Sequence, residues 1–317
     1  MENLIEKSEI LFLYESKFTI PNGDPFTGEQ RYDDETKHIL VSDVRIKRFV
    51  RDYFIDQNQI TPDKYEVFVF NDKSQIVEGS KESGASARMQ SLWKKYYPEK
   101  KPDKKQLPKA ALSLLQKCID VRLFGGISTE EKAAVNITGP VQFALLNPSL
   151  NKVDLRIHQN TSVFSSSADK SRGTIGTTTV VPYALNQIHG WINPFSAINS
   201  GLTQMDIDEL FAAMWYSINN SNTRSKSNQN SVLLIQIVYS NTNDKLYGTD
   251  KLISINSDKE EEQIREMDDY TLDFSKLAEK ANSDKVKEIR YYTEMSTIKK
   301  VITDLNNNKI KPLTLIK

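Results

Sequence analysis

The spacing of apolar residues along the chain predicts an alternation of strands and helices. Residues 9–19 alternate with a period of two, which places Ile10, Phe12 and Tyr14 on one face of a strand. Further strands are predicted over residues 65–70, 119–124, 135–146, 153–164, 179–185 and 231–239. A period of 3.6 predicts helices over residues 42–54, 85–97, 110–118, 203–219, 272–281 and 295–305. The early order of strand, helix, strand, helix and strand is that of an α+β, ferredoxin-like or RRM-like sheet.

Polar segments interrupt this pattern in two places. Residues 71–109 form a long insertion that carries many lysines, and residues 165–179 are rich in Ser, Thr and Gly. The second segment is typical of a mobile hairpin or loop extension rather than of core. We expect a single elaborated domain over residues 1–317, with a helical and polar C-terminal region, 241–317, packed on the sheet.

The first predicted helix is amphipathic and basic. Ile46, Phe49, Val50 and Tyr53 fall on one side of it, and the cations Lys47, Arg48 and Arg51 fall roughly opposite. Ser42 or Asp43 can cap its start, and a turn at residues 21–25 (PNGDP) begins the stretch that ends with this helix. Free N–H groups at a helix start suit a phosphate, so the stretch predicts a site for a nucleic-acid backbone. The alternative is a solvated helix face whose charges bind nothing.

Composition and charge narrow the choice of function. The 317 residues are 38% hydrophobic and 26% charged, without an apolar run long enough to span a membrane, and the N-terminus lacks the apolar core of a signal peptide. The single cysteine, Cys118, allows no internal disulfide and fits a cytoplasmic setting. A formal net charge of zero argues against a diffuse DNA binder.

The charges are nevertheless segregated along the chain. Residues 81–109 are rich in lysine and residues 258–273 are rich in Asp and Glu. Two such surfaces on one subunit could meet head-to-tail in an assembly that does not close. Ordinary solvated loops are the alternative interpretation.

Familiar catalytic and metal-binding motifs are absent from the sequence. There is no Walker A pattern, no G-x-G-x-x-G after a strand, no H-E-x-x-H and no cysteine pair. The histidines His38, His158 and His189 have no ligand spacing. We therefore expect no resident metal or cofactor. Asp24, Asp33 and Asp34 could bind a divalent ion, although aspartates at turns usually serve the turn itself.

Several short motifs resemble, in the same order, those of the Cascade backbone subunits of type I CRISPR systems. The turn at residues 20–25 (IPNGDP) closely resembles the NPNGDP turn of that family, from which it departs at Ile20, where the family usually has Asn. Residues 40–53 look like the helix that follows. The remaining motifs are DVRLFGG at 120–126, GPVQ at 139–142, GTIG at 173–176, VPY at 181–183, NPF at 193–195 and TRSK at 223–226. The resemblance covers about residues 8–240, and the type I-B branch looks closest.

This resemblance implies an RRM-like palm with inserted finger segments, at 71–109, and a thumb hairpin, at 160–180. It implies a non-catalytic subunit that polymerises along CRISPR RNA, with other copies of itself and other Cascade subunits as partners. Target DNA would be recognised by pairing with the guide. The thumb of one copy would press on the guide held by the next copy.

Such a subunit should contact phosphate and sugar rather than base edges. The predicted RNA-binding residues are Asn22, Ser42, Arg45, Lys47, Arg48, Arg51, Gly125, Gly126, Lys170, Arg172, Arg224 and Lys226. The two glycines would let RNA approach the backbone closely. Arg122 is a further candidate for RNA contact, but it could instead form a structural ion pair. The sequence leaves two other functions open: a metal-dependent endoribonuclease that uses Asp24 or Asp33, and an unrelated metabolic enzyme with a pocket of perturbed acids.

Overall fold

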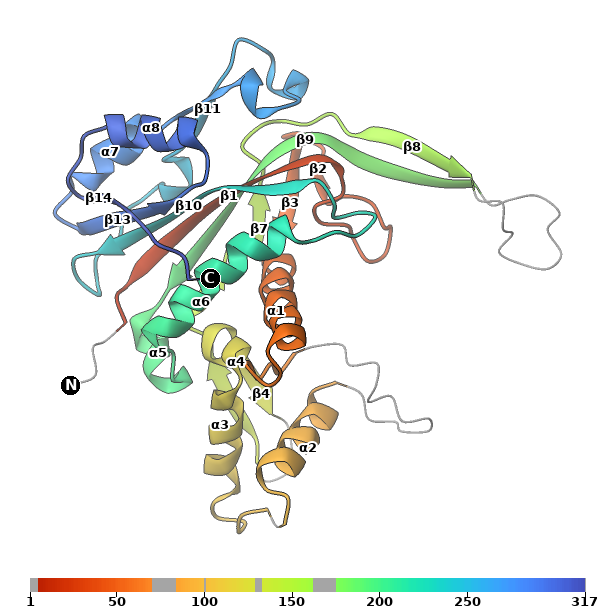
Figure 1. Cartoon of the computed structure of the whole chain (residues 1–317), viewed down its shortest axis with the longest axis vertical. Coiled ribbons are helices and arrows are strands. Elements are labelled where there is room, and N and C mark those ends of the chain that lie inside the picture. Colours follow the sequence, from red (N-terminus) through yellow and green to blue (C-terminus); the bar gives the residue numbers. More distant parts are fainter. Residues whose placement is uncertain (1–4, 70–83, 100, 129–132, 162–174, 317) are drawn as a thin grey trace.

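The computed structural model describes residues 5–69, 84–99, 101–128, 133–161 and 175–316, and it has an α+β fold built on one central mixed sheet (Figure 1). The strand order is β14-β13-β10-β1-β9-β6, and β8 also pairs with β9. These strands are β1 (Ser8–Thr19), β6 (Val141–Phe143), β8 (Arg156–Thr161), β9 (Ile175–Ile192), β10 (Gln229–Tyr239), β13 (Val286–Tyr292) and β14 (Ile310–Pro312).

β1 lies at the centre of the sheet, where Phe12 is opposite Leu234 of β10 and Ile188 of β9. Both pairings are antiparallel, and the short β13–β14 pair is parallel. Helix α1 (Asp43–Ile60) follows β1, and α6 (Gln204–Asn219) lies between β9 and β10 in the chain. The elements that form this core follow along the chain in the order β-α-β-β-α-β, with other elements inserted between them. They are β1, α1, β6, β9, α6 and β10.

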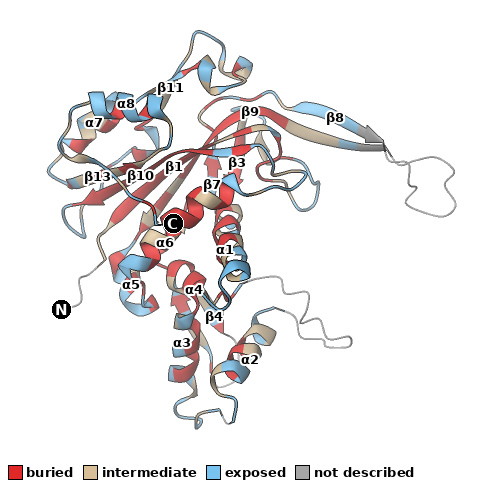
Figure 2. Cartoon of the chain, in the orientation of Figure 1, coloured by how far each residue is buried: buried red, intermediate tan, exposed pale blue. Residues whose placement is uncertain are grey.

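The alternation of β1 builds a core on each face of this sheet. Ile10, Phe12 and Tyr14 pack with α1 and α6 on one face. Leu11 and Leu13 pack on the other face with buried residues of the C-terminal region (Figure 2). That region contains β11 (Ser254–Asn256), β12 (Thr271–Asp273), α7 (Ser275–Ala281) and α8 (Ser296–Asp304). Three short 3₁₀ helices, at Thr249–Lys251, Glu261–Gln263 and Met267–Asp269, complete it.

A separate helical unit extends below the sheet in Figure 1 and has its own apolar cluster, which includes Leu92, Trp93 and Leu114. It contains α2 (Ala85–Tyr96), α3 (Leu107–Lys117), α4 (Ile119–Phe124), β4 (Gly125–Ser128) and β5 (Val135–Thr138). The predicted helix at 85–97 is therefore present, and the predicted helix at 110–118 begins three residues earlier than expected.

Two predicted strands are wrong. Residues 119–124 form α4. The prediction failed because a six-residue run with five buried side chains has no periodicity that separates strand from helix. Residues 65–69 make only an isolated bridge, Glu66 with Cys118. The buried carboxylate of Asp120 accepts hydrogen bonds from the N–H groups of Phe68 (2.7 Å) and Val69 (3.0 Å), and thereby replaces a strand partner. The last residue of that prediction, Phe70, lies outside the described residues.

Other boundaries differ from the prediction without changing the fold. The predicted strand at 135–146 is divided into β5, β6 and β7 (Leu146–Pro148), and β7 joins a small sheet with β2 (Tyr32–Asp33) and β3 (His38–Ser42). Residues 175–179 of the predicted mobile segment belong to β9, which continues from the sheet into a projecting hairpin with β8. Residues 162–174 lie outside the described part.

The hydrophobic pattern did not predict β13 or α5 (Pro194–Ser200). Among the described helices, none is both long and apolar enough to cross a membrane.

Candidate nucleic-acid interface

The turn at residues 21–25 is hydrogen-bonded to the N-cap residue of α1, Ser42. The side-chain oxygen of Asn22 accepts hydrogen bonds from the backbone N–H (2.7 Å) and the hydroxyl (2.8 Å) of Ser42. The N–H of Asn22 donates to the side chain of Gln30 (2.9 Å). Ser42 is the N-cap of α1, and its hydroxyl accepts a long hydrogen bond from the N–H of Arg45 (3.4 Å). The loop therefore fixes where α1 begins, and Asn22 itself is buried.

The loop after α6 meets the same place from the other side. The N–H of Ile20 donates to the carbonyl of Ser225 (3.0 Å), and the ammonium of Lys226 donates to the carbonyl of Ile20. Thr179, at the base of the β8–β9 hairpin, donates from its hydroxyl to Glu29 (3.3 Å). The end of β1, the start of α1, the loop at 220–228 and the hairpin base thus converge on one corner of the sheet (Figure 1).

This corner contains two partly buried cations, Arg45 and Lys226, and the charge of Asp52 acts on the first of them. Within the part of the chain that the structure describes, neither Arg45 nor Lys226 forms an ion pair. Burial, and then the nearby charge of Arg45, lower the pKa of Lys226 to about 8. Burial also lowers the pKa of Arg45, whose guanidinium lies 3.7 Å from the centre of the Phe49 ring and whose Nε is buried without a hydrogen-bond partner. Two like charges held together in a partly desolvated place favour the binding of an anion.

The other cations of α1 are placed differently from the prediction of an open basic face. Lys47 pairs with Asp43 (3.1 Å) and donates to the side chain of Gln142 (2.9 Å), and its side chain is only 13% exposed. Arg51 pairs with Asp120 (2.9 Å) and is 14% exposed. Arg48 is the exposed member of the three, and it pairs with Asp52 along the helix. α1 therefore does not present three free cations to solvent.

The Arg51–Asp120 pair leads to a stability prediction. The carboxylate of Asp120 is fully buried, so Arg51→Ala leaves a buried charge with only two backbone donors. We expect the free energy of unfolding to fall by about 3 kcal/mol in urea denaturation. Arg48→Ala is the matched control on the same helix, and its exposed pair contributes less than about 1 kcal/mol. Equal small losses for both variants would contradict the structural role of Arg51.

Arg122, the further candidate, forms a structural pair with Asp206. Its Nε donates to one carboxylate oxygen of Asp206 (3.0 Å) and its Nη2 to the other (2.6 Å). Asp206 also accepts from Thr203 in the capping box of α6, the helix predicted at 203–219. The ion pair thus connects α4 to the start of α6.

Gly125 and Gly126 lie at the turn from α4 into β4, where the closest atoms belong to this chain. A Cβ on Gly125, whose φ is +84°, would lie 2.4 Å from the carbonyl oxygen of Ile137. A Cβ on Gly126 would lie 3.1 Å from a methyl group of Val121. Packing within the helical unit thus gives Gly125 a reason to be glycine that involves no RNA.

The remaining predicted contacts are Arg224, Lys170 and Arg172. Arg224 is exposed on the same loop as Lys226. Lys170 and Arg172 lie outside the described residues. The structure brings five of the predicted contacts to one corner: Asn22, Ser42, Arg45, Arg224 and Lys226. Lys47 and Arg51 lie against α4, and Gly125 and Gly126 follow it in β4. Arg48 is exposed on α1.

The aspartates of the alternative nuclease function are occupied by turn interactions. Asp24 pairs with Arg31 (3.1 Å) and accepts from the N–H of Phe26 (2.9 Å). Asp33 is half-buried, and a hydrogen bond from the hydroxyl of Thr36 contributes most to lowering its pKa. Among the described residues, no group of three or more His, Cys, Asp or Glu side chains could hold a metal ion.

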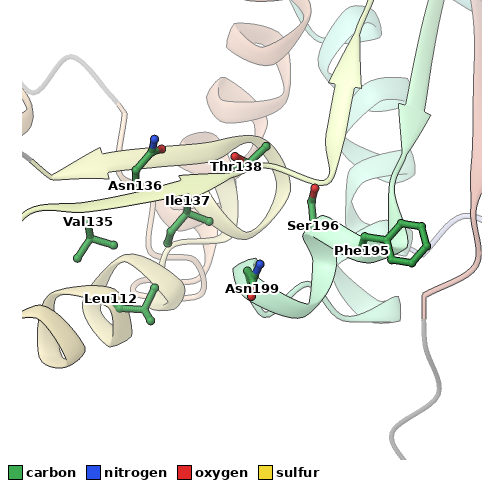
Figure 3. A pocket seen from close by; sticks show the side chains of 8 residues that line it. All are labelled: Leu112, Val135, Asn136, Ile137, Thr138, Phe195, Ser196 and Asn199. Carbon is green, nitrogen blue, oxygen red and sulfur yellow. The ribbon is translucent and has the colours of Figure 1, made fainter.

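One hollow of about 540 Å³ lies between α3, β5 and α5 (Figure 3). None of its eight lining residues has an ionisable side chain, so it offers no acid or base to a metabolic enzyme. The lining residues are Leu112, Val135, Asn136, Ile137, Thr138, Phe195, Ser196 and Asn199.

Sequence reasoning overlooked Tyr14 as part of the charged corner. Its hydroxyl is buried without a hydrogen-bond partner, and the charge of Arg45 acts on it. Burial raises the pKa of Tyr14, so the hydroxyl remains a neutral donor. The alternation of β1 placed Tyr14 on the face that α1 covers, and this was the available signal.

Three comparisons with known proteins show which family and fold this chain resembles. A curated relative from Haloferax volcanii, described as CRISPR-associated protein Cas7, is 26% identical over 298 residues, which cover 87% of this chain and 82% of the relative. A chain of a CRISPR RNA-guided surveillance complex has a similar fold, with a TM-score of 0.51 at 13% identity, over 92% of this chain and 90% of that one. A chain of such a complex in a pre-nicking state has a TM-score of 0.54 at 14% identity, over 98% and 96%. Residues 6–275 match the sequence pattern of the family described as CRISPR-associated protein Cas7. Since this match covers most of the chain, the protein belongs to the Cas7 family.

Proposed function

We propose that the protein is a non-catalytic backbone subunit of a type I Cascade complex, of the I-B branch, that binds CRISPR RNA through its sugar-phosphate chain. The observation that carries this proposal is the pair of partly buried cations, Arg45 and Lys226, that form no ion pair among the described residues. Membership of the Cas7 family and the likeness to chains of RNA-guided surveillance complexes support it.

A phosphate placed between Arg45 and Lys226 would relieve the repulsion between them. The start of α1, an 18-residue helix, adds a favourable dipole at the same corner. Arg224 lies on the loop that carries Lys226 and is exposed to a passing strand. These contacts go to phosphate and leave the base edges of the guide free, so the guide can pair with target DNA whatever its sequence.

In this proposal the central sheet is the palm, residues 71–109 form a finger insertion and residues 160–180 form the thumb. β9 runs without interruption from its pairing with β1 into its pairing with β8. The hairpin is therefore a continuous extension of the sheet over its described length, which suits an element that must reach the guide segment of a neighbouring copy.

Charge placement supports a head-to-tail assembly of copies along the RNA. Helices α2 and α3 lie at one end of the long axis, and the acidic segment at 258–273 lies at the other end (Figure 1). Lys94, Lys104, Lys105 and Lys109 are exposed at the first end. Some acids at the second end pair within the chain, as Glu262 does with Lys37 (3.2 Å), whereas Asp258, Glu260 and Asp268 are exposed. Opposite charges at opposite ends allow an open, non-closing interaction between copies.

The test is purification after co-expression with a CRISPR array. We expect RNA of guide length to co-purify with several copies of the protein per RNA, and the result to be the same for arrays with unrelated spacers. A chain that purifies free of RNA from every array would reject the proposal.

Incubation with magnesium and complementary RNA tests the nuclease alternative, because periodic cuts that vanish in Asp24→Ala or Asp33→Ala would favour it.

A further inference from the structure

Phe18 has a backbone conformation that its own side chain disfavours. Its φ is +50°, in the left-handed region that bulky residues other than glycine rarely adopt. The side chain is 63% exposed, although the next two residues, Thr19 and Ile20, are buried. A large aromatic ring is thus held in solvent at a strained position, at the end of the central strand of the sheet.

Hydrogen bonds on both sides of Phe18 maintain this conformation. The N–H of Lys17 donates to the carbonyl of Asn228 (3.1 Å), and the side-chain amide of Asn228 donates back to the carbonyl of Lys17 (2.8 Å). After Phe18, the N–H of Ile20 donates to the carbonyl of Ser225 (3.0 Å). On the β9 side, Lys17 pairs with Tyr183 and Thr19 with Val181, so that Phe18 is opposite Pro182, a residue without an N–H.

These anchors connect Phe18 to the cation site. The loop that holds its backbone is the loop that carries Lys226, and the ammonium of Lys226 contacts the carbonyl of Ile20, two residues after Phe18. Two residues span at most about 7 Å when extended, and the positive φ of Phe18 makes the span shorter here. The base and the phosphate of one nucleotide are separated by a comparable distance. Strained backbone that hydrogen bonds over-determine is typical of functional positions.

We propose that Phe18 is a stacking platform for a base of the single-stranded RNA whose phosphates bind Arg45 and Lys226. This inference rests on the proposed function. An exposed aromatic ring beside a cationic site is the combination that binds single strands without sequence preference, because every base has a face that can stack. Phe18 would orient one base beside the phosphate contact while the site remains indifferent to which base it is.

The test compares two RNA probes, an oligonucleotide with all its bases and one of the same length with abasic sites. Phosphate contacts are the same in both probes, but only the first can stack. We expect the wild-type chain to bind the base-bearing probe about tenfold more tightly. Phe18→Gly and Phe18→Asn both accept a positive φ and lack the ring, so they should bind the two probes equally. Because they relieve the backbone strain, their unfolding midpoints should be no lower than that of the wild type.

Two further variants sharpen the result. Phe18→Trp should keep the preference for the base-bearing probe, and its additional fluorescence should be quenched when that probe binds. Tyr247→Ala, which removes an 83% exposed aromatic ring from the C-terminal region, is the matched control and should behave as the wild type does.

Three other results of these binding experiments would contradict the stacking proposal or the proposed function. Equal binding of the two probes by the wild type would overturn the stacking proposal and leave the phosphate site intact. Failure to bind either probe would reject the proposed function itself. If Phe18→Gly instead disrupts self-association measured without RNA and preserves the preference between probes, Phe18 is a contact between copies and the stacking proposal is wrong.

Discussion

Lys226→Ala weakens the binding of single-stranded RNA by about 2 kcal/mol, or roughly thirtyfold in the dissociation constant, at pH 7. The reason is that Lys226 and Arg45 are held at one corner and form no ion pair among the residues that the structure describes, so a phosphate can supply a counter-charge there. The measurement is fluorescence anisotropy with labelled oligonucleotides of several unrelated sequences. The loss should be the same for all of them, since the contact is with phosphate. A loss confined to some sequences would contradict the account.

The same residue gives the binding a pH dependence. The pKa of Lys226, about 8 in the free chain, lies below its ordinary value because of burial and then Arg45, and a bound phosphate raises it. RNA binding therefore takes up a proton when the solution is above pH 8, and the affinity should fall about tenfold between pH 7 and pH 9. Lys226→Arg is the matched control, because an arginine stays charged and the fall should disappear. A pH dependence that is equal in both proteins would assign the titration to another group.

Gly139→Ala is expected to lower the free energy of unfolding by roughly 3 kcal/mol or more. A Cβ at this position would lie 2.0 Å from the carbonyl carbon of Phe124 and 2.4 Å from the N of Gly125, so one backbone must move away from the other. The contact holds the end of α4 against the β5–β6 connection, beneath the sheet. Urea unfolding followed by circular dichroism measures the effect.

The control for this prediction is Gly126→Ala. Its added Cβ meets only side-chain methyl groups of Val121, at 3.1 and 3.3 Å, which can shift by a few tenths of an ångström. We expect a loss of about 1 kcal/mol or less there. Similar stabilities for the two variants would show that the approach of the two backbones does not matter.

Strand and helix positions could be predicted where a long element has a clear period. β1, α1, α6 and β10 are such elements, and each is ten or more residues long. Residues 119–124 could not, because the choice between strand and helix depends on Asp120, whose carboxylate binds backbone groups more than 50 residues away in sequence. Local pattern contains no information about such a partner.

The candidate site was predictable only as a set of residue types. The turn at 21–25 and the start of α1 could be assigned to one site from sequence, but the hydrogen bonds between Asn22 and Ser42, 20 residues apart, could not be predicted. The sequence could not predict which of the cations would form an ion pair within the chain. Arg51 and Lys226 are both cations near apolar residues, and they differ because tertiary structure gives Arg51 a buried acid and gives Lys226 only a backbone carbonyl.

The central claim is that the corner formed by the end of β1, the start of α1 and the loop after α6 holds the guide RNA. Ultraviolet cross-linking of the co-purified complex, with 4-thiouridine in the RNA and peptide identification by mass spectrometry, tests it most directly. The account predicts cross-links concentrated in residues 17–31, 42–54 and 219–230, and their loss in Arg45→Ala/Lys226→Ala. Cross-links concentrated instead on α3 or in the C-terminal region, unaffected by these substitutions, would contradict it.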